Sequence, residues 1–350
     1  MSSQNDMKQH LKRKSALAVG LIGAGRAGLI HGRNFSHRVV GATLVALSDP
    51  DELTRHAAAG ELGIERSYAR YEQLLDDPEV DAVVIVTPTD FHRDIALAAA
   101  RRGKHILCEK PMAMNAVECA GMIEAAAQAG VILQIGFMRR FAKPFQEMKQ
   151  RIAAGEIGDV VAVRSLTHGP SLPQSWMYDL KASNGPLAEV NSHDIDTIRW
   201  MTGSEVVEVF ALGGNFRSPK AREAFPDFYD NVTLLARFAN GMQGTISGAQ
   251  GAGYGYDARC EVLGTSGILF AGSLQSMAVT QATSQGLLSP IINSWQELFA
   301  EAYLAEDQDF ILSIREERAP KVTGLDGMRA VEVVNAGNES IRTGQPIRLS

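Results

Sequence analysis

Apolar segments and helical patterns alternate regularly from Leu17 to Phe137, and this alternation restricts the possible folds more than any other feature of the chain. The apolar segments are continuous runs rich in valine, isoleucine and leucine. Strands are expected at Leu17–Gly23, Thr43–Asp49, Ala82–Thr87, His105–Glu109 and Ile132–Phe137, and helices at Arg26–Ser36, Phe91–Arg101 and Ala116–Ala129. Continuous apolar strands separated by helices form parallel sheets that are buried on both faces. We therefore expect a doubly wound α/β domain over residues 15–138.

The pattern changes after Met138. Further strands are expected at Val160–Thr167, Val206–Phe216, Asn231–Phe238, Gln243–Gln250, Arg259–Leu263 and Ile268–Phe270, and helices at Pro144–Ala154, Trp295–Arg315 and Leu325–Thr343. Asn240-Gly241 separates two of these strands and predicts a tight hairpin, because both residues tolerate positive φ angles. Residues 139–350 should therefore form an α+β domain with a large, mostly antiparallel open sheet.

The bulk properties agree with two packed domains and exclude some classes of partner. A chain of 350 residues suits two domains, and 45% hydrophobic with 21% charged residues is typical of a globular protein. The net charge of −6 argues against general affinity for nucleic acid or anionic membranes. Three widely spaced cysteines without a Cys/His cluster predict neither a metal site nor a disulfide framework, and their sparseness favours the reducing cytoplasm.

The N-terminus loosely resembles a signal peptide, because Lys12, Arg13 and Lys14 precede the apolar run Ala16–Ile22. That run is short, and cleavage behind it would destroy the glycine-rich loop that follows. We expect residues 1–14 to be a disordered tail, and no stretch approaches the ~20 apolar residues of a membrane span.

The glycine-rich loop Gly23-Ala24-Gly25-Arg26-Ala27-Gly28 has the spacing G-x-G-x-x-G directly after a strand and before a helix. In a Rossmann fold such glycines allow a tight turn, close approach of the backbone to a pyrophosphate, and close packing of helix on strand. The helix that begins there directs free N–H groups at the phosphates. Gly23, Gly25, Arg26, Ala27 and Gly28 are therefore candidate cofactor-binding residues. A purely structural glycine turn is the alternative interpretation.

Asp49 ends the second expected strand, 21 residues after Gly28. An acid at this position accepts hydrogen bonds from the adenosine ribose and repels the 2′-phosphate of NADP. No arginine adjoins it, so NAD is the favoured cofactor. A helix N-cap is the alternative role, and both roles are compatible.

Two further motifs carry chemistry. Cys108-Glu109-Lys110-Pro111 lies at the carboxyl end of an expected strand, which is the edge where open α/β sheets bind ligands. Far downstream, the segment Glu189–Asp196 contains a histidine and several acids, and His193, Asp196, Ile198 and Trp200 can lie on neighbouring turns of one helix. Singly, a lysine before proline or a histidine on a helix is more often structural, so the interpretation depends on their joint occurrence.

With these motifs the chain resembles the Gfo/Idh/MocA oxidoreductase family. The resemblance extends from about Leu17 to the end. It rests on the glycine loop, Thr87-Pro88 followed by His92, the Glu-Lys-Pro triplet and His193-Asp194-Ile195-Asp196. Within the family the chain is most similar to inositol 2-dehydrogenases, in Gly136-Phe137-Met138-Arg139-Arg140-Phe141, Tyr254-Gly255-Tyr256-Asp257 and Glu306-Asp307-Gln308-Asp309-Phe310-Ile311.

The resemblance implies specific roles. Lys110 and His193 would be catalytic with the help of Glu189, and a cis peptide bond would precede Pro111. Thr87, Pro88, His92, Glu109 and Lys110 would join the glycine loop and Asp49 in binding NAD, although His92 could instead simply pack. Substrate would contact Lys110, Met138, Arg139, His193, Asp196 and Tyr256. The family also forms dimers or tetramers through the face of the second sheet, for which Asn231–Phe238 and Gln243–Gln250 are the candidates.

The expected reaction is NAD-dependent oxidation of a secondary hydroxyl of a cyclic polyol. His193 suits a general base because histidine titrates near neutral pH, and Lys110 would stabilise developing alkoxide character. An inositol is the leading substrate, but Glu189 stands where inositol dehydrogenases usually have aspartate, and the segment Thr167-His168-Gly169-Pro170 lacks their usual asparagine. A glucose-type sugar, a glucoside or an amino-cyclitol is the first alternative, and a non-catalytic dinucleotide-binding sensor is the second.

Overall fold

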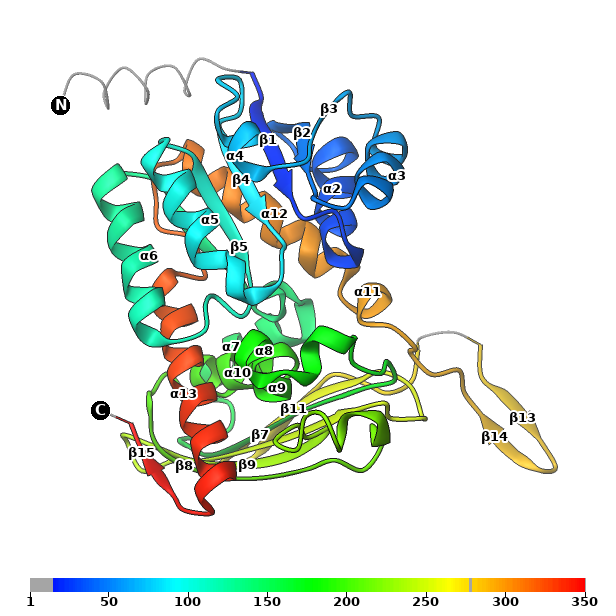
Figure 1. Ribbon diagram of the computed structural model, residues 1–350. Coiled ribbons are helices and arrows are strands. Elements are labelled where there is room, and N and C mark those ends of the chain that lie inside the picture. The colour runs from blue at the N-terminus through cyan, green and yellow to red at the C-terminus, as the bar shows by residue number, and fades with distance from the viewer. Residues whose placement is uncertain (1–14, 277–278, 350) are drawn as a thin grey trace. The chain divides into compact units, whose positions relative to one another are not determined.

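The computed structural model describes residues 15–276 and 279–349, which form two compact units (Figure 1). The first unit contains the described residues up to Met138 together with Glu301–Met328. The second contains Arg139–Ala300 and the described residues from Arg329 onward. The tail expected over residues 1–14 lies outside the described residues.

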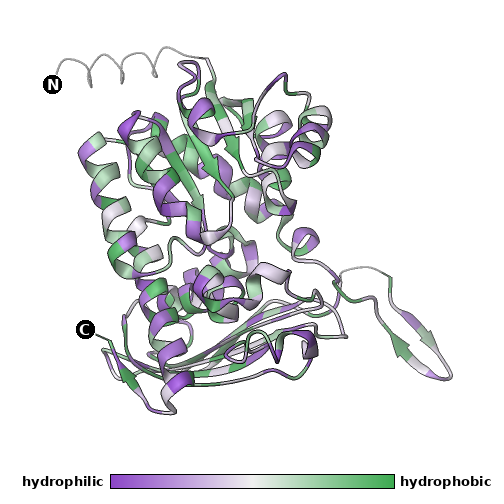
Figure 2. Cartoon of the chain, in the orientation of Figure 1, coloured by the Kyte–Doolittle hydropathy of each residue, from purple (hydrophilic) through white to green (hydrophobic). Residues whose placement is uncertain are grey.

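The first unit is built on six parallel strands in the order β3-β2-β1-β4-β5-β6. The strands are β1 (Leu17–Ile22), β2 (Ala42–Ser48), β3 (Arg66–Tyr68), β4 (Ala82–Ile85), β5 (His105–Glu109) and β6 (Leu133–Gly136). The helices between them are α2 (Arg26–His37), α3 (Glu52–Leu62), α4 (Tyr71–Leu75), α5 (Thr89–Arg101) and α6 (Ala116–Ala129). The strands are mostly apolar in Figure 2, as a sheet covered on both faces requires. This is the expected doubly wound Rossmann fold.

Strand order reverses between β1 and β4, and the loops after these two strands meet at the carboxyl edge of the sheet. A Cβ atom added to Gly23, after β1, would lie 2.4 Å from the carbonyl oxygen of Val86, after β4. The glycine loop and the Thr87 segment are therefore neighbours at the point where open α/β sheets bind ligands.

Helix α12 (Ala300–Arg315) belongs to the first unit, although the sequence analysis assigned residues 301–328 to the second domain. Phe310, Ile311 and Ile314 of this helix join the core cluster around Leu17 and Phe35. The sequence shows that the helix is amphipathic but not which sheet receives its apolar face. The expected single helix Trp295–Arg315 is also divided at Phe299, into α11 (Trp295–Leu298) and α12.

The second unit contains a seven-stranded sheet in the order β12-β11-β7-β10-β9-β8-β15. The strands are β7 (Val160–Gly169), β8 (Val206–Gly214), β9 (Asn231–Phe238), β10 (Gln243–Gln250), β11 (Asp257–Gly264), β12 (Ile268–Ala271) and β15 (Ile347–Arg348). Among the described residues β7 and β10 pair in parallel, and the other neighbours pair antiparallel, as the expected α+β fold requires.

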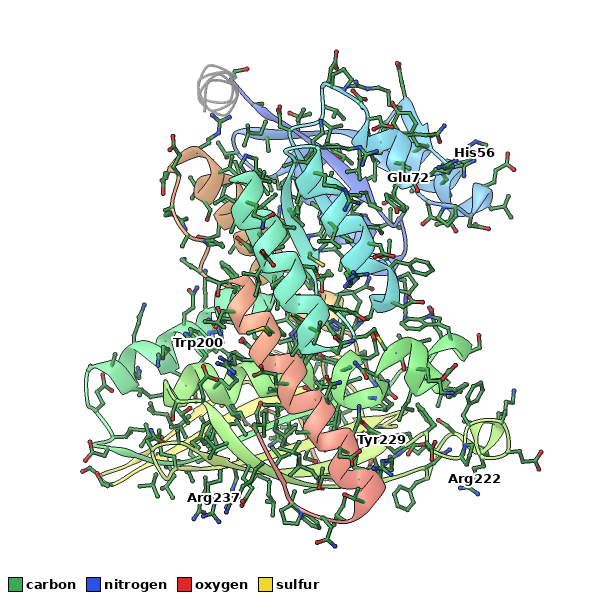
Figure 3. The ribbon with its side chains drawn as sticks, turned by 60° about the vertical axis from the view of Figure 1, so that its left-hand side comes forward. His56, Glu72, Trp200, Arg222, Tyr229 and Arg237 are labelled. Carbon is green, nitrogen blue, oxygen red and sulfur yellow. The ribbon has the colours of Figure 1, made fainter. Side chains whose placement is uncertain are left out.

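Helices α7 (Lys143–Ala153), α9 (Gly185–Glu189) and α10 (Ser192–Thr202) cover one face of this sheet (Figure 1). Shorter helical segments are η1 (Met138–Phe141), η2 (Ser175–Tyr178), α8 (Leu180–Ser183) and η3 (Pro219–Ala221), and α13 (Gly324–Thr343) runs from the first unit into the second. Along β9 buried and exposed residues alternate, so Leu235 and Arg237 lie on the face away from the helices. Figure 3 labels Arg237 on this face.

The Asn240-Gly241 turn joins β9 to β10 as expected. Phe238 N donates to Met242 O over 3.0 Å, and Gly241 has a φ of 87°. The short strands β3, β13 (Gln281–Thr283), β14 (Gly286–Leu288) and β15 have no counterpart among the expected strands. Within the described part of the chain, no helix is both long and apolar enough to cross a bilayer.

Candidate active site

Two of the three loop glycines are required by the packing of the first unit. Gly23 has a φ of 94°, a conformation that side chains rarely adopt. A Cβ atom on Gly28 would lie 2.1 Å from the carbonyl oxygen of Gly23. These glycines therefore form the turn and allow helix α2 to pack closely on β1.

Gly25 differs, because an added Cβ atom would meet no described atom within 4 Å. It is the N-cap of α2, makes no side-chain capping hydrogen bond, and is exposed together with Arg26, while Ala27 is half-buried. The N-terminus of α2 thus presents backbone N–H groups toward open space, with their partial positive charge. This cradle fits the pyrophosphate of a dinucleotide.

Asp49 connects the loops around this cradle. Its carboxylate accepts hydrogen bonds from Ala24 N and Asp51 N, each over 2.9 Å. The cap of α3 is Asp51, which accepts from Thr54 N, so the N-cap alternative for Asp49 is wrong. Arg55, which the sequence analysis did not consider, donates to Asp49 O over 2.9 Å.

His92 is a brace between two loops. One ring nitrogen lies 2.8 Å from Pro111 O and the other 2.8 Å from Thr87 O, and the side chain is 1% exposed. Burial lowers the pKa of His92, and the two carbonyl acceptors oppose that effect. The structure therefore supports the packing role of His92, and its contact with the cofactor stays a prediction. The ring ties the Thr87-Pro88 loop to the Lys110–Pro111 bond, which is cis as expected.

Glu109 and Lys110 are adjacent in the sequence, but their side chains have different surroundings. The Glu109 carboxylate is buried, with Oε1 3.2 Å from His31 Nε2 and Oε2 accepting from Lys110 N over 3.0 Å. The Glu109 carboxylate therefore binds the backbone N–H of Lys110. Its expected contact with the cofactor stays a prediction. Lys110 itself is half-buried at the end of β5.

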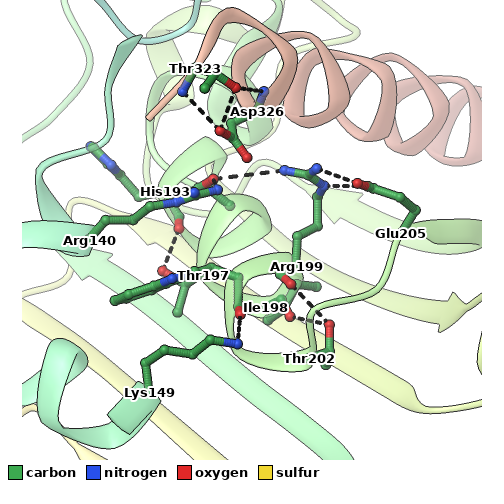
Figure 4. Close-up of polar contacts among 12 residues, drawn as sticks. Arg140, Lys149, His193, Thr197, Ile198, Arg199, Thr202, Glu205, Thr323 and Asp326 are labelled. Carbon is green, nitrogen blue, oxygen red and sulfur yellow. Dashed lines mark hydrogen bonds and ion pairs between the residues drawn. The ribbon is translucent and has the colours of Figure 1, made fainter. Parts of the chain in front are cut away.

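His193 lies in the first turn of α10 and is 5% exposed. Its carbonyl oxygen accepts from Thr197 Oγ1 over 2.7 Å (Figure 4), and Asn191 precedes the helix as N-cap. Glu189 is half-buried at the end of α9, four residues earlier. The short break between α9 and α10 thus brings these two expected catalytic residues onto one segment of the second unit.

Arg139 lies inside the second unit, and its contacts differ from those expected of a substrate ligand. Its guanidinium is 1% exposed and donates to Asp194 Oδ1 over 2.8 Å and to Thr167 Oγ1 over 2.5 Å. Asp194 also accepts from Ser165, Thr167 and Asn191. This network fastens the start of α10 to strand β7.

Asp196, also expected to contact substrate, forms an ion pair with Arg140. Two guanidinium nitrogens of Arg140 approach the Asp196 carboxylate at 2.8 and 2.5 Å, and the carboxylate is 1% exposed. The Arg140 guanidinium lies 5.9 Å from the Trp200 ring, one turn farther along α10. The structure therefore uses Asp196 to fix the helix.

Tyr256 and Met138 are both buried. Burial raises the pKa of the Tyr256 hydroxyl, an effect that the neighbouring Arg139 partly offsets. The Tyr256 ring also packs edge-on against Phe299 at 6.4 Å. Met138 ends the first unit and Tyr256 belongs to the second.

Sequence reasoning missed the pairing of Asp194 with Arg139 and of Asp196 with Arg140, as well as the partners of Glu109. A signal for the first two was present, because two consecutive arginines and two acids two residues apart form matching pairs. His31 lies on α2 and gave no signal, since its partners lie far away in sequence.

A Rossmann unit with an open pyrophosphate cradle and an α+β unit carrying a histidine helix define a two-domain dinucleotide-dependent oxidoreductase. Residues 17–137 match the family model of Gfo/Idh/MocA oxidoreductases with an NAD-binding Rossmann fold, and residues 145–270 match the C-terminal domain of the same family. The chain belongs to the Gfo/Idh/MocA family, and it is an NAD-dependent oxidoreductase acting on CH–OH groups.

The relatives cover nearly the whole chain. It is 36% identical to the NAD-dependent scyllo-inositol 2-dehydrogenase of Bacillus subtilis, over 94% of this chain and 95% of the relative. It is 33% identical to the myo-inositol 2-dehydrogenase of Thermotoga maritima, over 95% and 98%. The structure of scyllo-inositol dehydrogenase from Lactobacillus casei with bound NAD(H) and scyllo-inositol is similar, with a TM-score of 0.87, 27% identity, and coverage of 95% and 99%.

Proposed function

We propose that this protein oxidises one secondary hydroxyl of an inositol to a ketone, with NAD as the acceptor. The observation that carries the proposal is the state of the carboxylates around His193. Asp194 and Asp196, its close neighbours on α10, are each neutralised by an arginine. Glu189 ends α9 four residues before His193, and we assign it to the substrate hydroxyls and to His193.

Oxidation of an alcohol requires removal of the O–H proton as the C–H hydrogen leaves with its electrons. Bound at the glycine cradle and Asp49, NAD would supply the acceptor for that hydride. His193 takes the hydroxyl proton, a role that typically contributes ~10²–10⁴-fold to the rate. The Lys110 ammonium donates to the same oxygen and stabilises the negative charge that develops there. The Arg139–Asp194 and Arg140–Asp196 pairs keep the His193 helix fixed against β7 and η1.

Glu189 is the residue that we connect with the choice of isomer. Its side chain is one methylene longer than the aspartate usual in inositol dehydrogenases, and misplacement of about 1 Å can cost ~10²-fold in rate. A site built to hydrogen-bond hydroxyls also rejects an isomer that leaves one of its polar groups unpaired. We therefore expect activity on at least one inositol isomer, with myo-inositol not necessarily the best.

A panel of inositol isomers and glucose-type pyranoses, assayed for NADH formation, tests the proposal. The wild type should reduce NAD with an inositol, and Glu189→Asp should reorder the isomers while leaving the dissociation constant for NAD within about twofold. Glu156→Asp, an exposed acid in the second unit, is the matched control and should keep the wild-type order. Turnover of a glucose-type sugar with no activity on any inositol would place the protein in another branch of the family.

The outer face of the second sheet supports self-association, which is part of the same proposal. Leu212, Leu235 and Phe270 lie on the face opposite the helices and are 61%, 51% and 69% exposed. Cross-strand register places them in one surface together with Arg164 and Glu261. Apolar side chains gathered on a large sheet face are typical of a protein interface. We assign this surface to contact with a second copy in a dimer or tetramer.

A further inference from the structure

Four ionisable side chains are buried together in the first unit, behind the segment that carries Lys110. They are His31 from α2, Glu109 from β5, and Glu306 and Asp307 from α12, and none is more than 5% exposed. Three acids and one histidine in an interior need an explanation, because an unpaired buried charge is very costly.

His31 accounts for two of the acids. Its Nδ1 lies 2.6 Å from Asp307 Oδ1, and its Nε2 lies 3.2 Å from Glu109 Oε1. Asp307 Oδ2 also accepts from Asn34 Nδ2 over 2.8 Å. Burial disfavours the imidazolium, but Asp307 and Glu109 outweigh it and raise the pKa of His31 well above its usual value. A protonated His31 donating from both nitrogens is therefore sandwiched between two carboxylates.

Glu306 is the third acid of the cluster, and His31 forms its two hydrogen bonds with the other two acids. It is 0% exposed, and neither of its carboxylate oxygens has a hydrogen-bond partner among the described residues. One of these oxygens, a ring nitrogen of His31 and a carboxylate oxygen of Glu109 all lie within 4.8 Å of one another. Burial raises the pKa of Glu306 well above its usual value, Glu109 raises it further, and His31 opposes both.

The other groups recorded near Glu306 are an amide and two further acids. From β6, Gln134 donates to the Glu306 backbone oxygen, and from α12 the charged neighbours are Asp307 and Asp309. Asp309 is itself paired with Arg318. Among the largest influences on the pKa of Glu306, His31 is the one that favours ionisation, and it is already shared by two carboxylates.

We propose that Glu306 is a positioning residue that carries a proton at neutral pH, and that its neutrality keeps the Glu109 carboxylate in place as the acceptor for the Lys110 backbone. The geometry supports this because Glu109 Oε2 accepts from Lys110 N over 3.0 Å while Oε1 faces His31. A second carboxylate beside Glu109 would repel it and disturb that hold. The consequence for catalysis rests on the proposed role of Lys110, but the protonation of Glu306 does not.

The sign of the pH dependence follows from the raised pKa. Between the pKa of Glu306 in the unfolded chain and its higher value in the folded protein, the folded state binds more protons than the unfolded state. Folding stability therefore falls with rising pH across this window. Glu306→Gln keeps the neutral shape and removes the titration, so it should gain in melting temperature relative to the wild type as pH rises from about 5 to 9.

Besides the melting profile, two further measurements on the 350-residue chain test the inference. Difference infrared spectroscopy should show a carbonyl band of a protonated carboxylic acid in the wild type at pH 7, and Glu306→Gln should lack it. As the pH rises, wild-type kcat should fall by about tenfold per pH unit once Glu306 ionises. The kcat of Glu306→Gln should begin to fall only at a higher pH. Glu301→Gln, on the same helix with a 73% exposed side chain, is the control and should change neither the band nor the melting profile.

A pH-independent difference in melting temperature between the wild type and Glu306→Gln, with no band lost, would overturn the inference. So would a stoichiometric divalent metal in the purified protein that Glu306→Gln removes, since the cluster would then hold a cation in place of protons. If the band and the melting profile behave as expected but the alkaline limbs of kcat coincide, Glu306 is protonated and the proposed role of Lys110 is the part that fails.

Discussion

The Asp49 carboxylate holds the glycine loop and, in the proposed function, also contacts the cofactor. Its oxygens accept from Ala24 N and Asp51 N, and each oxygen keeps a lone pair for the ribose of a dinucleotide. Its negative charge also repels a 2′-phosphate, which Arg55 offsets only in part because that guanidinium is engaged with the Asp49 carbonyl oxygen. Asp49 therefore shapes the glycine loop, and we propose that it also favours NAD over NADP.

We expect wild-type protein to use NAD at least about tenfold better than NADP in kcat/KM, a difference of ~1.4 kcal/mol. Asp49→Asn keeps a hydrogen-bond acceptor and removes the charge, so it should narrow the preference with little effect on folding. Asp49→Ala should narrow it too and also lower the melting temperature, because the glycine loop loses its tie. Steady-state kinetics with both cofactors check this, and equal use of NAD and NADP by the wild type would refute it.

Residues that belong to the same sequence motif differ in their surroundings in the structure. Gly23, Gly25 and Gly28 were predicted together, yet Gly25 alone leaves open space for a ligand. His92 and Glu109 belong to motifs near the expected cofactor, but both side chains are buried and bonded to the protein. Sequence spacing identifies the loop on which a residue lies, whereas the direction of its side chain depends on partners distant in sequence.

Elements with long, regular patterns were predicted closely. Strands β5, β9 and β10 and helix α6 have the expected bounds, because apolar runs end there at clear turn or capping residues. The very short strands β3 and β15 have too few residues for any periodicity, and they form because a longer neighbour offers an edge. Helix α12 was expected, but its place in the first unit depends on Phe310 and Ile311 meeting a core built from residues 17–107.

The outer faces of β8, β9 and β12 lead to an expectation about assembly. Light scattering at micromolar concentration should give the mass of a dimer or tetramer. Leu235→Glu places a charge at the centre of the apolar surface and should shift the mass toward the monomer. Val117→Glu, on α6 of the first unit and 82% exposed, is the matched control and should leave the mass unchanged. A monomeric wild type would contradict the assigned surface.

In the proposed function each unit would carry part of the chemistry. The pyrophosphate cradle, Asp49 and Lys110 belong to the first unit, and His193 and Glu189 lie on the α9 and α10 segment of the second. Because NAD binding depends on the first unit alone in this account, cofactor affinity and turnover should be separable by mutation.

The most direct test compares Lys110→Ala and His193→Ala in kcat and in NAD affinity. The account predicts that each lowers kcat by roughly two orders of magnitude or more, because a charge-stabilising or proton-accepting group is lost, while the NAD dissociation constant changes by less than about threefold. Lys143 on α7 and His56 on α3 are exposed, and Figure 3 labels His56. Lys143→Ala and His56→Ala are therefore matched controls and should retain wild-type kcat. Near-normal turnover in either Lys110→Ala or His193→Ala would remove that residue from the mechanism and contradict the central claim.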